Sequence, residues 1–253
     1  MNPKVLVGIV TYSGKEYCLD KFISSLRNIV ADCKKYDICE DVMFFDNSKE
    51  LDYFNKLKNC GFDVVKCSHS DDPKYAICES YNILRGYFLE NCYTHLFCLE
   101  QDVIPKPEII RQLLSYDKKV CSGWYNVFYN NQTRPCVGKI REFKPTKEEQ
   151  VLIDKDIKKL IDSGHSISPT ASIKKYDYAR YDELDEDRCI PVYFSGLGCV
   201  LIKKEVLEKI CFVLVRKGNK YITFNDMQFY HDLAYCKIVP YVDTSLFCEH
   251  IKE

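Results

Sequence analysis

The sequence lacks any hydrophobic run long enough to cross a bilayer. A spanning helix needs roughly 18 or more apolar residues in succession, and no segment of this chain approaches that length. The first apolar run, residues 5–12, meets Lys15 and Glu16 and has no small-residue cleavage site, so it indicates a buried strand and not a signal peptide. We therefore expect no transmembrane segment and a cytoplasmic protein, which could reach a membrane only peripherally, through a surface feature or a partner.

An excess of charge of either sign is also missing. The chain has 36 basic and 37 acidic residues among its 253, which gives a formal net charge of -1. Dedicated nucleic-acid binders usually carry a basic excess that neutralises phosphates. The charge balance therefore argues against that class, and we expect no nucleic-acid partner.

The 15 cysteines include no C-x-x-C pair, which removes the usual signal of a zinc ribbon or a thioredoxin-like site. Many of them lie inside apolar runs, as Cys98 and Cys199 do, where cysteine acts as a small hydrophobic residue. A reduced cytosol and a hyperthermophile with intracellular disulfides both fit this usage, and the sequence does not decide between them.

Strand-like and helix-like segments alternate through the first 120 residues. Apolar residues three and four apart give the segments 19–30 and 81–89 one hydrophobic stripe each, as in amphipathic helices. The apolar, β-rich runs between them predict strands at 5–10, 42–45, 62–65, 96–99 and 120–121. This alternation predicts an α/β fold with a mostly parallel sheet and helices on both faces.

The alternation stops at residues 125–191, which are aromatic, charged and irregular. One helix is expected there, over 147–161, because a capping box starts at Thr146 and Gly164 supplies a stop. We interpret 125–191 as an insertion within a single domain of residues 1–253. After it the pattern predicts two strands and two helices, at 198–202 and 238–242, and at 204–212 and 227–235.

Polar residues that could bind a ligand follow the strands expected at 5–10 and 42–45. Ligands of open α/β sheets bind beyond the carboxyl ends of the strands. Thr11 and Tyr12 follow the first strand, and Asp46 and Asn47 follow the second. A hydroxyl, an aromatic ring and a carboxylate suit a nucleoside, although the same residues are also ordinary loop and turn formers.

Two acids, Glu100 and Asp102, follow the strand expected at 96–99. Carboxylates at i and i+2 on a strand end point to one side, so they can share one hard cation. Helix capping near Pro105 is the alternative interpretation.

Taken together, these segments resemble the nucleotide-sugar half of family 2 type glycosyltransferases of the GT-A fold. The similar segments are Val7-Gly8-Ile9-Val10-Thr11-Tyr12, Phe44-Phe45-Asp46-Asn47-Ser48 and Leu99-Glu100-Gln101-Asp102. The third is similar to the metal-binding D-x-D motif of that family, with Glu100 as its first acid. Tyr81-Asn82 stands where many members have Arg-Asn near the ribose and phosphates.

The second half of the chain is similar to the same family. The small-residue segment around Gly196 resembles the lining of the donor-sugar and acceptor pocket, and Asn225-Asp226-Met227-Gln228-Phe229 resembles the E-D-x-x-F motif. The resemblance implies that Asp226 is the catalytic base and that His250, at the end of the closing strand, is a metal ligand together with Glu100 and Asp102.

The resemblance therefore implies a GT-A (Rossmann-like) fold and a metal-dependent glycosyltransferase. It implies Mn²⁺ or Mg²⁺ as cofactor, a nucleoside-diphosphate sugar as donor, and an unidentified glycan, lipid-linked or protein acceptor that the region 125–191 would contact. The donor-binding residues would be Thr11, Tyr12, Asp46, Asn47, Asn82, Glu100 and Gly196. With Asp226 as general base the expected mechanism is inverting. A nucleotidyltransferase and a non-catalytic sugar-nucleotide or glycan-binding protein are the alternatives.

Overall fold

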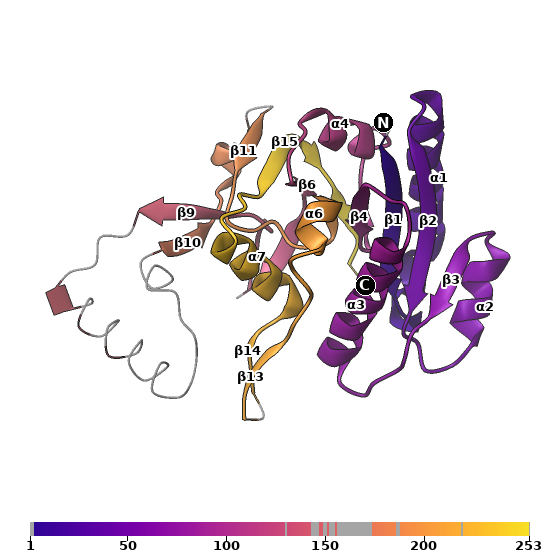
Figure 1. Ribbon diagram of the computed structural model, residues 1–253, viewed down its shortest axis with the longest axis horizontal. Helices are drawn as coiled ribbons and strands as arrows, with labels where there is room; N and C mark the ends of the chain where they lie inside the picture. The colour runs from indigo at the N-terminus through magenta and orange to yellow at the C-terminus, as the bar shows by residue number, and fades with distance from the viewer. Residues whose placement is uncertain are drawn as a thin grey trace.

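The computed structural model describes residues 3–129, 131–142, 147–148, 151, 155, 174–185, 188–218 and 220–252. Its centre is an eight-stranded sheet with the strand order β11-β15-β6-β12-β4-β1-β2-β3 (Figure 1). The strands are β1 (Lys4–Thr11), β2 (Cys39–Asp46), β3 (Asp63–Lys66), β4 (His95–Leu99), β6 (Val120–Trp124), β11 (Cys189–Pro191), β12 (Cys199–Lys203) and β15 (Tyr241–Phe247).

Parallel pairings dominate this sheet. Strand β1 lies between β2 and β4, and β3 extends the sheet beyond β2, all in parallel. Strand β12 is antiparallel to both β4 and β6. Beyond it, β15 is parallel to β6 and β11 is antiparallel to β15. The predicted α/β fold with a mostly parallel sheet is therefore confirmed.

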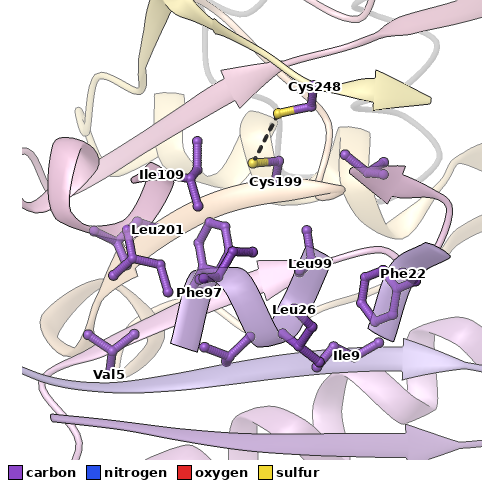
Figure 2. Close-up of a cluster of buried hydrophobic side chains, with 14 of the residues drawn as sticks. Val5, Ile9, Phe22, Leu26, Phe97, Leu99, Ile109, Cys199, Leu201 and Cys248 are labelled. Carbon is purple, nitrogen blue, oxygen red and sulfur yellow. Dashed lines mark hydrogen bonds between the residues drawn. The ribbon is translucent and has the colours of Figure 1, made fainter. Parts of the chain in front are cut away.

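Helices cover both faces of the sheet because side chains alternate along each strand. Val5 and Ile9 of β1 pack with α1, as Figure 2 shows, whereas Leu6 packs on the opposite face. The first face carries α1 (Leu19–Lys35), α2 (Asp52–Asn59) and α4 (Ile109–Ser115), and the second carries α3 (Pro73–Glu90), α6 (Lys204–Leu207) and α7 (Asn225–Tyr235). Gly8 allows α3 to approach closely, because a Cβ there would lie 2.5 Å from Leu84.

Two expected elements are wrong in their bounds. The helix predicted over 204–212 ends at Leu207; beyond it, the backbone N–H and carbonyl of Phe212 are both bonded to the side chain of Asn82, which holds the segment away from helical geometry. The strand predicted over 238–242 begins at Tyr241 and continues to Phe247, since Pro240 has no N–H for the ladder. Most of the helix expected over 147–161 lies outside the described residues.

Short elements surround the sheet. They are the 3-10 turns η1 (Ser13–Cys18) and η2 (Tyr181–Glu183) and the strand pairs β5 (Val103–Ile104) with β16 (Glu249–His250), β7 (Asn126–Tyr129) with β8 (Gln132–Pro135), β9 (Gly138–Glu142) with β10 (Lys174–Tyr178), and β13 (Val215–Lys217) with β14 (Lys220–Thr223). Within the described part of the chain, no helix combines the length and apolar character that crossing a bilayer requires.

Candidate active site

The segments that the sequence placed at strand ends meet at one edge of the sheet. Thr11 pairs with Asp46 at the carboxyl ends of β1 and β2. Leu99, at the end of β4, pairs with Cys199, the first residue of the antiparallel strand β12. The segment Gly196–Gly198, called the glycine segment here, therefore enters the sheet at the same edge as the acidic turn, Glu100–Asp102, that follows β4.

The two acids of that turn differ in environment. Glu100 is half-buried, whereas Asp102 is 4% exposed. Oδ2 of Asp102 accepts from Nζ of Lys15 and lies 3.3 Å from Nε2 of His250. Oδ1 of Asp102 is buried and has no hydrogen-bond partner among the described residues. Oδ2 is thus paired with positive charge, whereas Oδ1 has no hydrogen-bond partner in the described part of the chain.

Pairing of β16 with β5 brings His250 beside Asp102, because His250 is the register partner of Val103. Nδ1 of His250 lies 2.7 Å from the carbonyl oxygen of Asn126. A carbonyl only accepts hydrogen bonds, so Nδ1 carries the hydrogen and Nε2 faces the carboxylate. Neutral His250 therefore presents a lone pair at Nε2 for a metal, and protonated His250 donates from Nε2 to Asp102.

The charges in this cluster shift one another's pKa. Burial, with the nearby charge of Asp102, raises the pKa of Glu100 to about 7. Burial also acts to raise the pKa of Asp102, but the His250 hydrogen bond and the charge of Lys15 outweigh it and leave that pKa lowered. The hydrogen bond to Asp102 raises the pKa of His250. Asp102 is therefore the ionised member of the pair, and Glu100 titrates near neutrality.

Gln101, between the two acids, supports them from the core side. It is 1% exposed, and its Oε1 accepts from the hydroxyls of Thr11 at 2.5 Å and Tyr53 at 2.7 Å. Its Nε2 donates to the carbonyl of Lys15 at 2.7 Å. The strand β4 ends at Leu99, and residues 100–103 form a turn closed by the Val103 N–H on the Glu100 carbonyl, so the two acids do not stand on an extended strand end as expected. Within this turn Gln101 anchors β1, α2 and the η1 turn.

The expected nucleoside side is built around a buried carboxylate. Asp46 is 0% exposed; its Oδ1 accepts from the backbone N–H of Ser48 at 3.0 Å, and its Oδ2 accepts from Lys66 at 2.9 Å. Asn47 donates to Ser80 at 3.1 Å. Tyr12, in contrast, is 43% exposed. Asp46 and Asn47 thus shape the turn, while the Tyr12 ring is open to a ligand.

Hydrogen bonds and close packing hold the glycine segment against α7. Gly196 has φ of +70°, and a Cβ there would lie 2.3 Å from the hydroxyl of Tyr125. The hydroxyl of Tyr230, on α7, donates to the Gly196 carbonyl at 2.5 Å and lies 2.7 Å from Ser195 Oγ. These contacts fix the start of α7, and with it Asp226, beside the acidic turn.

Asp226 is half-buried in the first turn of α7 and close enough to Glu100 for their charges to interact. A helix N-terminus tends to keep a carboxylate ionised. Burial instead raises the pKa of Asp226, although the backbone N–H groups of Met227 and of Asp226 itself lower it. Desolvation outweighs the helix terminus at this position.

Asn82, expected to bind the donor, has its amide engaged elsewhere. Its Nδ2 donates to the Phe212 carbonyl at 2.7 Å and its Oδ1 accepts from the Phe212 N–H at 3.0 Å. It thereby ties α3 to the segment that leads toward α7.

The described residues include no group of three or more His, Cys, Asp or Glu side chains placed to hold a metal. The donor chemistry nevertheless fits a hard divalent cation, because Oδ1 of Asp102 is a buried oxygen without a partner among these residues, His250 faces the other oxygen of the same carboxylate, and Glu100 is close enough for its charge to interact with that of Asp102. The expected ligand types are present, and Lys15 provides the positive charge next to them.

Sequence reasoning missed four residues of this region, namely Lys15, Gln101, Tyr125 and Tyr230. Lys15 follows a strand end, and Gln101 alternates with two acids, so both carried a weak local signal. Tyr125 is the first residue of the expected insertion, yet it is 4% exposed and its hydroxyl accepts from the Gly198 N–H at 3.2 Å. Nothing local marks Tyr125 or Tyr230, because their partners are distant in sequence.

Similarity to solved structures defines the class of fold. The chain superposes on GalNAc-T7, solved with UDP, GalNAc and Mn²⁺, with a TM-score of 0.55 and 13% identity, over 100% of this chain and 44% of that one. It superposes on the mannosyltransferase PcManGT from Pyrobaculum calidifontis, solved with GDP-Man and Mn²⁺, with a TM-score of 0.57 and 9% identity, over 100% of this chain and 58% of that one.

The chain has the GT-A fold, as the sequence resemblance implied. It spans about half the length of these two relatives. No protein-family model matches the sequence, and comparison with curated proteins gives no significant match.

Proposed function

We propose that this protein is a glycosyltransferase that moves a sugar from a nucleoside-diphosphate sugar to an acceptor hydroxyl. One observation carries the proposal: Asp102 has a buried oxygen without a partner among the residues that the structure describes, and the same carboxylate contacts His250 and interacts with the charge of Glu100, at the sheet edge where α/β folds bind nucleotides. The GT-A fold and the nucleotide-sugar and Mn²⁺ complexes of its structural relatives support the same function.

The nucleoside would lie along the ends of β1 and β2. The exposed ring of Tyr12 offers a surface for the base. Thr11, Asp46 and Asn47 hold the turn against which the base and ribose would rest. Gly196 would border the donor sugar, and its missing side chain leaves room for the hydroxyl of Tyr125 behind it.

Glu100, Asp102 and His250 would hold Mn²⁺ or Mg²⁺. When bound there, the cation supplies positive charge that offsets the charge of the donor diphosphate and of the departing nucleoside diphosphate. Without that cation two carboxylates would face the diphosphate, which would disfavour donor binding.

Asp226 would accept the proton of the acceptor hydroxyl as that oxygen attacks the anomeric carbon. A carboxylate within hydrogen-bond reach of the nucleophile can do this, and a raised pKa makes it a stronger base once it is ionised. Attack from the face opposite the leaving group inverts the anomeric configuration.

A thermal-shift screen of UDP-, GDP- and TDP-sugars tests the proposal. We expect one nucleotide sugar to raise the unfolding midpoint in the presence of MnCl₂, because a ligand that binds only the native state stabilises it. Excess EDTA and the Asp102→Ala variant should each remove that shift. Glu90→Ala serves as the matched control, since Glu90 is an exposed carboxylate at the end of α3.

Reaction assays separate the proposed activity from its alternatives. Labelled nucleotide sugar should be consumed, slowly by hydrolysis without an acceptor and faster with one. Formation of nucleotide sugar from labelled nucleoside triphosphate and sugar phosphate would replace the proposal with nucleotidyl transfer. Binding without turnover or hydrolysis would indicate a non-catalytic protein, and an equal shift with and without EDTA would remove the metal.

A further inference from the structure

Lys15 contacts Asp102 and neutralises its charge. It lies on η1, directly after β1, and its Nζ contacts Oδ2 of Asp102, the oxygen that also faces His250. The Lys15 side chain is 26% exposed, whereas that of Asp102 is 6% exposed. An ionised carboxylate so deeply buried is costly unless it is paired, so Lys15 supplies the positive charge that stabilises Asp102.

Lys15 differs from the other lysines near this edge. Lys66 binds Asp46, whose two oxygens both have partners. Lys21 pairs with the exposed Glu249, with side chains 54% and 56% exposed. Of these three lysines, only Lys15 is paired with a carboxylate that has a buried oxygen without a hydrogen-bond partner within the described ranges.

A lysine at this place competes with a metal on electrostatic grounds. An ammonium and a divalent cation on one carboxylate repel each other strongly in a partly buried site. The Lys15 side chain is 26% exposed, so its ammonium is not enclosed at Asp102. The flexible four-carbon stem of lysine allows the charge to move.

We propose that Lys15 is an exchangeable internal cation, which occupies Asp102 in the metal-free protein and passes to the donor diphosphate when a divalent metal takes Asp102. The proposal rests on the proposed function for its anionic partner. Such an exchange makes the metal and the nucleoside diphosphate bind cooperatively. The metal releases Lys15 for the diphosphate, and the diphosphate draws Lys15 away from the metal site. The coupling free energy is equal in both directions.

Binding of Mn²⁺ alone, followed by the electron paramagnetic resonance signal of the free ion, tests the exchange. We expect Lys15→Met to bind Mn²⁺ about tenfold or more tighter than the unmodified protein, because the competing charge is gone. UDP or GDP should tighten Mn²⁺ binding markedly in the unmodified protein and much less in Lys15→Met. Lys15→Arg, which keeps the charge, should keep the weaker Mn²⁺ binding. Lys21→Met, which removes a neighbouring exposed lysine, should behave like the unmodified protein.

A second measurement needs no variant. Acylation of lysines, read by mass spectrometry, should label Lys15 faster when Mn²⁺ is added, since the metal releases the amine from Asp102. Adding UDP or GDP with Mn²⁺ should protect Lys15 again, while labelling of Lys21 stays constant.

The outcomes are distinct. Equal Mn²⁺ affinity of Lys15→Met and the unmodified protein, or labelling of Lys15 that ignores Mn²⁺, would overturn the exchange and leave the glycosyltransferase proposal standing. Tighter Mn²⁺ binding by Lys15→Met in a protein that neither binds nor consumes any nucleotide sugar would keep the competition at Asp102 and overturn the proposed function.

Discussion

Gln101 shows how one side chain can hold a site that it does not enter. It joins the hydroxyls of Thr11 and Tyr53 to the carbonyl of Lys15, all within the buried floor of the acidic turn. Its removal would leave several buried polar groups without partners, which costs more than the bonds themselves contribute.

Gln101→Leu should lower the free energy of unfolding by about 2–4 kcal/mol, because buried donors and an acceptor lose their partner at once. Urea titration followed by circular dichroism measures this change. Gln132→Leu is the matched control, since Gln132 is exposed on β8. Equal stability of the two variants would show that Gln101 does not organise the turn.

Asp226→Asn should cut turnover by roughly a hundredfold to ten-thousandfold while donor affinity is kept. Asp20→Asn is the matched control, because Asp20 is likewise in the first turn of its helix, is exposed, and lies in α1. Near-normal turnover of a folded Asp226→Asn protein would exclude Asp226 as the base. A product with the anomeric configuration of the donor would exclude inversion.

The raised pKa of Asp226 also predicts pH dependence. Turnover should fall on acidification from a higher pH than for an ordinary aspartate, because the base is lost by protonation. A folded-state pKa above the unfolded value gives stability that is present at low pH and lost as pH rises through the folded pKa. Asp226→Asn should therefore raise the unfolding midpoint at neutral pH, measured by calorimetry, and much less at pH 3.

At the scale of elements, the closing strands are positioned by close backbone contact. Gly123 of β6 lies under β15, and a Cβ there would be 2.8 Å from the Leu246 carbonyl and 3.1 Å from the thiol of Cys248. Cys248 and Cys199 face each other with sulfurs 3.6 Å apart (Figure 2), and all 15 cysteines are free thiols. Because β15 leads to His250, the position of His250 depends on the missing side chain at Gly123.

Gly123→Ala should destabilise the protein by about 1–3 kcal/mol, because backbone and thiols must shift to admit the methyl group. It should also weaken Mn²⁺ binding through displacement of His250. Gly86→Ala, in α3, is the matched control: nothing lies within 4 Å of its Cβ, so we expect about 0.5–1 kcal/mol of stabilisation. Denaturant unfolding compares them, and similar values for both would refute the tight packing of β6 on β15.

At the scale of the whole molecule, the donor side and the proposed acceptor side are different parts of the chain. The first four strands and their helices would build the proposed nucleoside side. The pair β7–β8, within 125–191, borders the other side through the Asn126 carbonyl on His250. Phe128 of β7 is 61% exposed, with the ammonium of Lys252 5.3 Å from its ring centre.

Phe128→Ala should raise the KM for the acceptor about twofold to tenfold, the usual worth of one aromatic contact, and leave donor affinity unchanged. Steady-state kinetics with the acceptor, and calorimetric titration of the donor, measure the two effects. Tyr235→Ala is the control, because Tyr235 is 76% exposed at the opposite end of α7 from Asp226. Loss of donor affinity as large as that of Asp102→Ala would contradict this division.

Much of the fold followed from local patterns. Apolar runs and a helical period located β1, β4 and the start of α1 close to their observed bounds, whereas α3 begins at Pro73, eight residues before the predicted stripe at 81–89. The bounds failed where a distant partner decides them, as at Phe212, which Asn82 holds by its backbone across 130 residues. The candidate acids were visible for the same local reason, since both follow a strand that ends at the ligand-binding edge.

The sequence by itself determined which residue types stand at the strand ends, and therefore that a nucleotide and a hard cation suit this edge. Only the tertiary structure decided which of them meet: Lys15 and Asp102 are 87 residues apart, and His250 and Asp102 are 148 apart. Such pairs arise from the register of β16 on β5 and from the placement of η1 against the acidic turn. Neither pairing leaves a local pattern, because each is fixed by the packing of the whole sheet.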